Sequence, residues 1–151
     1  TTMIEGQITI DTLIIGGGPI GSSTAFHLSQ LRKNNGNEGS IVILEKDPTY
    51  KASSAMLSAG GIRQQFSLEE NIRMSLYGRD FLRSASTLLA TSSFPDVNVH
   101  FVEHGYLFLA STETEAQQLK ENHRVQRDVG CTSIHLLSPK QLKEQFPWLP
   151  W

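Results

Sequence analysis

The pattern of apolar and polar positions divides the first third of the chain into a strand, a helix and a second strand. The apolar run that ends at Ile15 predicts a strand over Ile8–Ile15, and it leads directly into a glycine-rich turn. A helical stretch follows from about Pro19 to Arg32, with burial expected for Ile20, Ala25, Phe26 and Leu28. A polar, turn-forming loop then precedes a second strand over Ser40–Glu45. This order is typical of a βαβ unit with parallel strands.

A long helix is predicted after residue 66. Ser67, with Glu70 three residues later, has the pattern of a capping box at the helix start. Apolar residues then recur at helical spacing, which predicts a buried stripe formed by Met74, Tyr77, Phe81, Ala85 and Leu88.

The last third of the chain changes to alternating apolar positions. Val97–Ala110 contains two such runs, interrupted at residues 103–105, and this predicts a β-hairpin. A helix capped by Thr112 and Glu115 should end at Gly130, followed by a short strand over Ile134–Leu137. A last helix should begin at Ser138, with Pro139 and Gln141 in its first turn. The fold class expected is therefore α/β: a Rossmann-like dinucleotide-binding βαβ unit within residues 1–95, then the start of an antiparallel sheet within residues 96–151.

The glycine turn carries the clearest chemistry in the sequence. Gly16, Gly18 and Gly21 have G-x-G-x-x-G spacing between the first strand and the helix. The first glycine permits a tight turn, the second allows a pyrophosphate to approach the main chain, and the third lets helix and strand pack closely. Glu45 ends the second strand 24 residues after Gly21, where an acid accepts hydrogen bonds from a ribose diol. A carboxylate there would repel a 2′-phosphate, so NADP is disfavoured.

The segment over residues 52–62 is composed almost entirely of small residues and lacks helical or strand periodicity. One interpretation is a flexible loop. The other is a wall against which a flat cofactor lies, with the Ser53 and Ser54 hydroxyls donating to phosphate. The position of the segment, directly after the second strand, favours the second interpretation.

Composition excludes several classes of protein. The 151 residues carry a formal net charge of −2, which gives no electrostatic basis for binding nucleic acid. The five histidines lack a metal-binding spacing, and the single cysteine, Cys131, rules out an internal disulfide. No apolar run approaches the roughly 18 residues of a membrane span. The chain begins at Thr1 without a recognisable secretory signal, and a removed organelle-targeting peptide is compatible with this start.

Several segments together resemble the FAD-dependent oxidoreductases of the D-amino-acid oxidase superfamily, which includes sarcosine oxidases and dimethylglycine and sarcosine dehydrogenases. The resemblance covers the glycine turn, Glu45-Lys46, residues 53–72, Gly105–Ala110 and Phe146-Pro147-Trp148. It is strongest to a mitochondrial branch associated with assembly of respiratory complex I. The residues that the resemblance assigns to FAD binding are Gly16, Gly17, Gly18, Pro19, Ile20, Gly21, Glu45, Lys46, Ser53, Ser54, Gly60, Gly61 and Ile62.

The resemblance also implies how the flavin is held and tuned. Arg63 lies where several relatives carry a basic residue close to the isoalloxazine, and a positive charge there would stabilise the anionic reduced flavin. An ordinary salt-bridged arginine is the alternative, and Gln64 and Gln65 are weaker candidates for the same cavity. Relatives with covalent FAD carry a histidine at the position of Leu57. We therefore expect FAD to be bound without a covalent bond.

Three functions are compatible with the sequence. The first is oxidation of a small-molecule amine or N-methyl amino acid, with hydride transfer to flavin. The second is a flavin-binding assembly factor for respiratory complex I with little or no catalysis. The third is an NAD dehydrogenase, which the absence of a regular third strand soon after Glu45 disfavours.

The resemblance carries two further expectations. Family members are well over twice as long, so we expect an N-terminal portion whose remaining half lies elsewhere, as a separate chain or as missing sequence. The mitochondrial branch implies a mitochondrial location, with respiratory-complex subunits as candidate partners.

Overall fold

The computed structural model describes residues 9–150, and contacts within the chain divide it into two compact units. One unit ends at Gly61 and the other begins at Ile62. These units reflect packing within the chain. The assignment of residues 1–95 and 96–151 to two functional domains stays a prediction.

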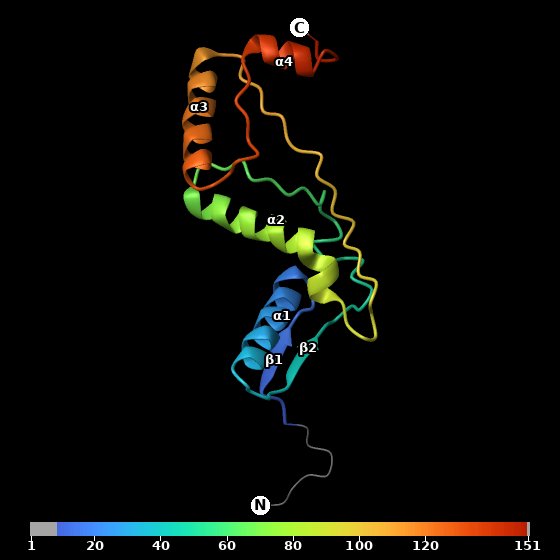
Figure 1. The fold of residues 1–151 in the computed structure, drawn as a ribbon. Coiled ribbons are helices and arrows are strands. Elements are labelled where there is room, and N and C mark those ends of the chain that lie inside the picture. Colours follow the sequence, from blue (N-terminus) through green and yellow to red (C-terminus); the bar gives the residue numbers. More distant parts are fainter. Residues whose placement is uncertain (1–8, 151) are drawn as a thin grey trace, which may run out of the picture. The chain divides into compact units, whose positions relative to one another are not determined.

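The first unit is the expected βαβ unit. Strand β1 (Thr12–Ile15) and strand β2 (Ile41–Leu44) pair in parallel, with Thr12 opposite Ile41 and Ile15 opposite Leu44. Helix α1 (Pro19–Asn34) connects them and packs against both strands (Figure 1). The mixed α/β class with a parallel sheet is therefore confirmed. The predicted start of the first strand at Ile8 lies outside the described residues.

A polar clamp fixes the register at the end of the sheet away from the glycine turn. The backbone N–H of Ser40 and its hydroxyl both donate to Oδ2 of Asp11, at 2.7 and 2.8 Å. Arg32, in the last turn of α1, donates to the Thr12 hydroxyl at 2.7 Å and to the Ser40 carbonyl oxygen at 3.1 Å. These bonds join the helix end to the start of both strands, so a one-residue slip of the pairing would break all of them.

Burial in α1 differs from the sequence expectation. Ala25, Phe26 and Leu28 are only half-buried, and Ile20 is 85% exposed. Ile20 lies in the first turn of the helix, beyond the ends of the short strands, and nothing in the unit covers it. The prediction that Ile20 is buried was wrong for that reason.

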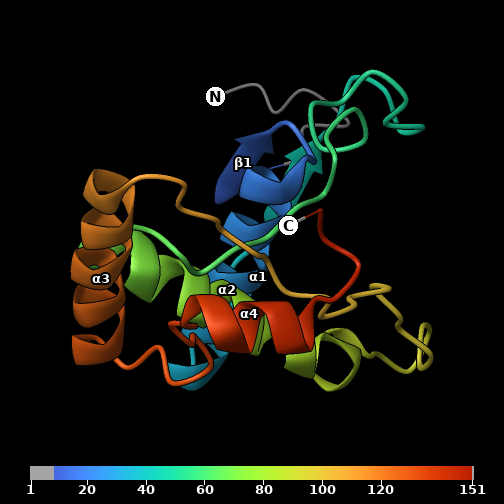
Figure 2. The same ribbon diagram turned by 90° about the horizontal axis from the view of Figure 1, so that it is seen from above.

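The second unit contains three helices: α2 (Glu69–Leu89), α3 (Glu113–Asp128) and α4 (Pro139–Gln145). α2 and α3 contact each other and run in different directions (Figures 1 and 2). Among the described residues, the fully buried apolar side chains are Ile72, Ala85 and Cys131. The buried stripe predicted for α2 is therefore correct at Ala85 but wrong at Met74, Tyr77 and Leu88, which stay at least 47% exposed because the described residues that lie near them do not cover them. No helix in the described part of the chain is long and apolar enough to cross a membrane.

Two of the three predicted helix caps are formed. The Thr112 hydroxyl accepts from the Glu115 amide, and the Glu115 carboxylate accepts from the Thr112 amide, so the capping box of α3 is complete. Ser138 and Gln141 form the same arrangement at α4, with Pro139 in the first turn. The capping box predicted at Ser67 was wrong, because α2 begins one residue later and Leu68 occupies the N-cap position without a side-chain cap.

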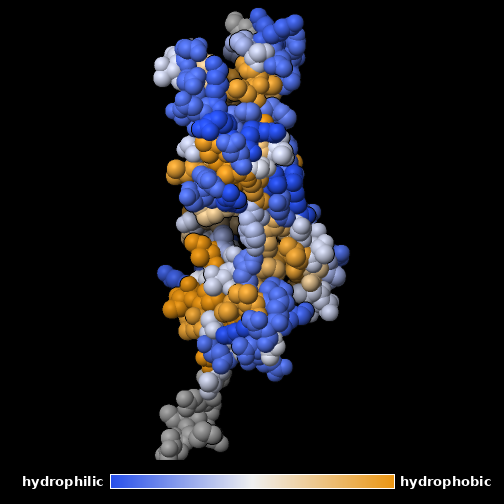
Figure 3. Space-filling view, turned by 60° about the vertical axis from the view of Figure 1, so that its left-hand side comes forward, coloured by the Kyte–Doolittle hydropathy of each residue, from blue (hydrophilic) through white to orange (hydrophobic). Residues whose placement is uncertain are grey.

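The hairpin predicted over Val97–Ala110 and the strand over Ile134–Leu137 are not formed in the described structure. Gly105 has a left-handed φ of 77°, as a turn requires, but the flanking apolar runs have no partner strand. Val102, Phe108 and Leu109 are exposed as a result, and Figure 3 shows hydrophobic side chains at the surface among hydrophilic ones. An alternating pattern indicates that a segment can form a strand, but the strand forms only where a second segment provides its hydrogen-bond partners.

The caps allow a matched stability test. Thr112→Ala removes the acceptor for an α3 amide and should lower the free energy of unfolding by about 1 kcal/mol. Ser67→Ala changes a residue whose side chain caps nothing in the structure and should leave stability within about 0.5 kcal/mol. Chemical denaturation of both variants measures this. Equal losses would show that the cap assignment is wrong.

Candidate functional site

The glycine turn is held in place by backbone contacts at both of its ends. Gly16 has φ of 96°, which side chains rarely adopt, and its amide donates to the Leu44 carbonyl oxygen at 2.8 Å. A Cβ at Gly21 would overlap the Gly16 carbonyl oxygen and lie 3.2 Å from Cγ2 of Ile14. The first and third glycines are thus required by the turn itself and by the close approach of α1 to β1.

The amino end of α1 presents bare backbone beside open space. Gly18 is the N-cap residue, no side chain caps the helix, and the first turn has no acidic residue. An added Cβ at Gly18 would meet no atom within 4 Å. Unsatisfied amides and the positive end of the helix dipole favour an anion, and the missing Cβ leaves room for it. These features fit the diphosphate of a dinucleotide.

Glu45 joins the turn to the end of β2. Its Oε2 accepts from the Gly17 amide at 2.6 Å, and its Oε1 accepts from the Asp47 amide at 2.8 Å. The Asp47 and Gly17 amides lower the pKa of the Glu45 carboxyl below its ordinary value, so it is ionised at neutral pH. Each carboxylate oxygen retains acceptor capacity for a further donor, such as a ribose hydroxyl.

Tyr50 is a neighbour of the turn that the sequence patterns did not indicate. Its hydroxyl oxygen lies 2.5 Å from the position that a Cβ on Gly17 would occupy. Tyr50 also has a left-handed φ of 55°, which is uncommon for a residue with a bulky side chain. The sequence signals for a turn before Tyr50 are Asp47 and Pro48, two residue types that are typical of turns.

The small-residue segment forms successive turns. The Ser53 hydroxyl accepts from the Met56 amide at 3.3 Å, and the Ser58 hydroxyl accepts from the Gly60 amide at 3.0 Å. Gly60 has φ of 64°, and Leu57 is 75% exposed. Cofactor binding by six further residues of the first unit stays a prediction: Pro19, Lys46, Ser53, Ser54, Gly60 and Gly61.

Ile62 and Arg63 begin the second unit. The Arg63 guanidinium lies over the Phe66 ring at 4.6 Å from its centroid and 6.0 Å from that of Phe108. No carboxylate in residues 9–150 forms an ion pair with Arg63 in the structure, so the alternative of an ordinary salt bridge has no support there. Cation–π contacts leave the charge uncompensated by any anion.

The neighbouring glutamines serve packing within the second unit. Gln64 Oε1 accepts from Arg79 at 3.4 Å and from the Cys131 thiol at 3.7 Å. The Gln65 side chain donates to the Tyr106 carbonyl oxygen at 3.4 Å. Both side chains hold segments of this unit together, which is a structural role.

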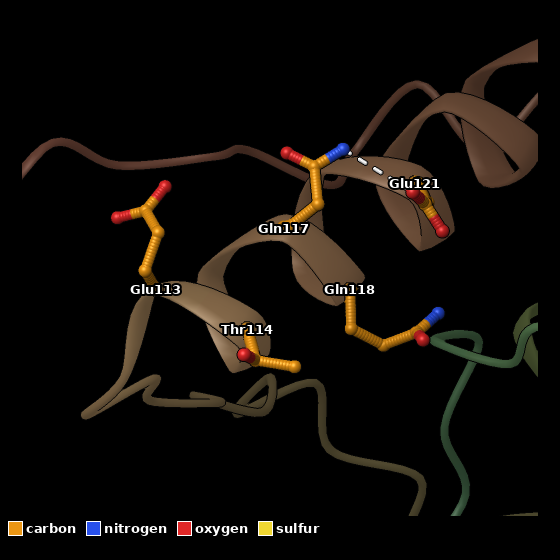
Figure 4. A pocket seen from close by; sticks show the side chains of 5 residues that line it. All are labelled: Glu113, Thr114, Gln117, Gln118 and Glu121. Atoms are coloured by element: carbon orange, nitrogen blue, oxygen red, sulfur yellow. Dashed lines mark hydrogen bonds between the residues drawn. The ribbon is translucent and has the colours of Figure 1, made fainter.

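Surface hollows outside the glycine turn are poor cofactor sites. One is lined by five residues of α3 alone, Glu113, Thr114, Gln117, Gln118 and Glu121 (Figure 4). Its polar side chains project from one helix surface, and Gln117 donates to Glu121. A second, apolar hollow is lined by Ile62, Phe66, Met74 and neighbouring residues of α2. No group of His, Cys, Asp and Glu suited to a metal ion occurs in the described residues.

Comparisons of the sequence with known proteins find relatives over most of the chain. A family model described as FAD dependent oxidoreductase (DAO) matches residues 11–151. The chain is 45% identical over 139 residues to FAD-dependent oxidoreductase domain-containing protein 1 of Xenopus laevis, covering 92% of this chain and 27% of that protein. It is 25% identical to mitochondrial sarcosine dehydrogenase of Mus musculus over 92% of this chain and 14% of that protein. Its identity to glycine oxidase of Geobacillus kaustophilus is 30%, over 80% of this chain and 30% of that protein.

The chain spans about a quarter of the length of the matched proteins that carry the name FAD-dependent oxidoreductase domain-containing protein 1. No solved structure matches it.

The glycines of the turn allow a first test of this site. Gly21→Ala places a methyl group on the Gly16 carbonyl oxygen and should cost about 2 kcal/mol or more of unfolding free energy. Gly18→Ala meets open space and should cost less than about 1 kcal/mol. Denaturation midpoints measure both. A Gly18→Ala loss as large as that of Gly21→Ala would contradict the open space at Gly18.

Acid should weaken the link between the turn and β2. Because the folded pKa of Glu45 is lowered, its contribution is complete above the unfolded value of about 4.3 and is lost as pH falls through the folded value. Glu45→Gln should therefore show a smaller loss of stability between neutral pH and pH 3 than the wild type. Glu38→Gln, in the loop before β2, is the matched control and should follow the wild type. Parallel pH profiles for all three proteins would exclude this role of Glu45.

Proposed function

Because the chain belongs to the FAD dependent oxidoreductase family, we propose that it forms the dinucleotide-holding part of an enzyme that oxidises small-molecule amines. The observation that carries this proposal is the uncapped amino end of α1, open at Gly18 and flanked by the ionised carboxylate of Glu45. It offers an anion site and a hydrogen-bond acceptor on the same βαβ unit. A dinucleotide with a diphosphate and a ribose diol needs both.

In this proposal the cofactor is bound without a covalent bond. Amides of the turn from Gly16 to Gly21 would bind the diphosphate, and Glu45 would accept from the adenosine ribose. Ser53 and Ser54 would add hydroxyl donors, while Gly60 and Gly61 would keep the backbone close to the flavin. Leu57 has no nucleophilic or ring nitrogen atom that could bond to FAD.

Arg63 would tune the reaction. When bound, FAD would accept a hydride equivalent from the carbon beside an amine nitrogen. The guanidinium of Arg63 has no carboxylate partner in the described residues and is kept in place by the Phe66 ring, so its positive charge remains available to stabilise negative charge nearby. This role needs Arg63 to lie beside the flavin in the complete protein.

The names of two relatives support an amine substrate. Sarcosine dehydrogenase and glycine oxidase are both named for small amino acids. The name of the former also describes it as mitochondrial, which supports a mitochondrial location for this protein. We further propose that residues 1–95 belong to the FAD domain, and that residues 96–151 begin an antiparallel substrate domain in which the exposed runs of 97–110 gain partner strands.

The alternative is that FAD is a structural ligand in an assembly factor for respiratory complex I. Both functions need the same site, so they differ in what the flavin does after binding. The enzyme predicts that an amine substrate reduces the bound flavin. The assembly factor predicts a flavin that stays oxidised and a protein that co-purifies with respiratory subunits.

The test uses purified intact protein. We expect flavin absorbance that persists after native purification, is released on denaturation, and bleaches anaerobically on addition of an N-methylated amino acid. Gly18→Ala should weaken FAD binding by about tenfold or more with unchanged folding, because its methyl group takes the space of the phosphate.

Ser23→Ala, on the exposed face of α1, is the matched control and should bind FAD as the wild type does. Protein that neither contains FAD nor takes it up on addition would refute the proposal. A flavin that resists every amine tested would favour the assembly factor.

A further inference from the structure

Tyr50 lies on the glycine turn without being part of it. Its side chain lies against Gly17: the hydroxyl oxygen is 2.5 Å and Cζ is 3.4 Å from the position that a Cβ added to Gly17 would occupy. Gly17 itself is buried. Any larger residue at position 17 would therefore have to displace the phenol.

The loop after β2 is built to place this side chain. Asp47 Oδ1 accepts from the Thr49 amide at 2.9 Å and from the Thr49 hydroxyl at 2.6 Å. The Tyr50 amide donates to the Asp47 carbonyl oxygen at 3.0 Å, and the Tyr50 carbonyl oxygen accepts from the Ser53 amide at 2.9 Å. Because Asp47 also donates to Glu45, the loop ties Tyr50 and Glu45 to the same few residues.

The hydroxyl of Tyr50 and the carboxylate of Glu45 converge on Gly17. The same added Cβ that lies 2.5 Å from the Tyr50 hydroxyl lies 3.4 Å from Glu45 Oε2. Oε2 is bonded to the Gly17 amide, whereas no hydrogen bond between the Tyr50 hydroxyl and the described protein is present. A half-buried phenol with a free donor thus stands beside the acceptor that would bind a ribose.

We propose that Tyr50 is a further cofactor-binding residue, whose hydroxyl donates a hydrogen bond to the adenosine ribose that Glu45 holds. This inference rests on the proposed function, since it assumes a dinucleotide at the turn. Glu45 is an acceptor only, so the two ribose hydroxyls can donate to it while one of them accepts from Tyr50. Glu45 and Tyr50 would then recognise the diol both as a hydrogen-bond donor and as a hydrogen-bond acceptor.

A purely structural Tyr50 is the competing explanation, in which the ring only covers Gly17. The two explanations differ in whether the effect of removing the hydroxyl depends on the ligand. Tyr50→Phe keeps the ring and deletes the donor. The ligands to compare are FAD, ADP, and 2′,3′-dideoxy-ADP, which lacks both ribose hydroxyls.

Flavin fluorescence on the intact protein measures the Kd of FAD and the displacement of FAD by each adenine nucleotide. Circular dichroism checks that each variant keeps its fold. We expect Tyr50→Phe to weaken FAD and ADP by about five- to tenfold, the range of one hydrogen bond, and to leave dideoxy-ADP unchanged. Equal weakening of ADP and dideoxy-ADP, or no weakening of either, would overturn the inference. In both cases FAD binding by the wild type would leave the proposed function intact, whereas a wild type that binds no FAD would refute both.

The position of the phenol has its own test. Gly17→Ala should destabilise the wild-type protein, because its methyl group meets the Tyr50 hydroxyl, and Tyr50→Phe should relieve much of that loss. Urea denaturation of the two single variants and the double variant measures the coupling. Additive losses would show that Tyr50 does not lie on Gly17 in solution, and would contradict the inference independently of any ligand.

Discussion

The hydrogen bond from the Gly17 amide to the Glu45 carboxylate is the constraint on which the candidate site depends. It joins the turn that follows β1 to the residue that follows β2, at the edge where the parallel strands end. Since Glu45 also accepts from Asp47, the same carboxylate sets the start of the next loop. Parallel strands bring their carboxyl ends together, so one acid can organise the turn, the sheet edge and the loop.

The two ends of this small sheet have different physical roles. At the end away from the turn, side chains bind the backbone of Ser40: its amide donates to Asp11 and its carbonyl oxygen accepts from Arg32. At the other end α1 begins without a cap, and Gly18 faces open space. Side-chain hydrogen bonds fix the register at one end, and unsatisfied backbone donors remain at the other end, where an anion is expected.

The second unit shows how far helices alone can build a core. Ile72, Ala85 and Cys131 are buried, and Gln126 crosses from α3 to bond the Phe66 carbonyl oxygen at 2.9 Å. The apolar residues of 97–110 are not among the buried side chains of that core, and the segment has no partner strand in the described structure. Arg83 and Glu103 nevertheless bond through two contacts, at 2.7 and 3.0 Å, and fasten this segment to α2. This ion pair therefore holds the segment against α2, although the segment pairs with no strand in the described structure.

Local sequence determined the elements whose hydrogen bonds are local. Periodicity and nearby side chains were sufficient to predict the parallel strands and the helices that begin at Pro19, Glu113 and Pro139. They also predicted the capping boxes at Thr112 and Ser138. The glycine spacing and Glu45 indicated a dinucleotide for the same reason. Burial of Met74, the hairpin after Val97 and the position of Tyr50 depended on contacts between distant segments. Only the tertiary structure could decide them, because a side chain's partner across a fold is not encoded in the period of its own neighbours.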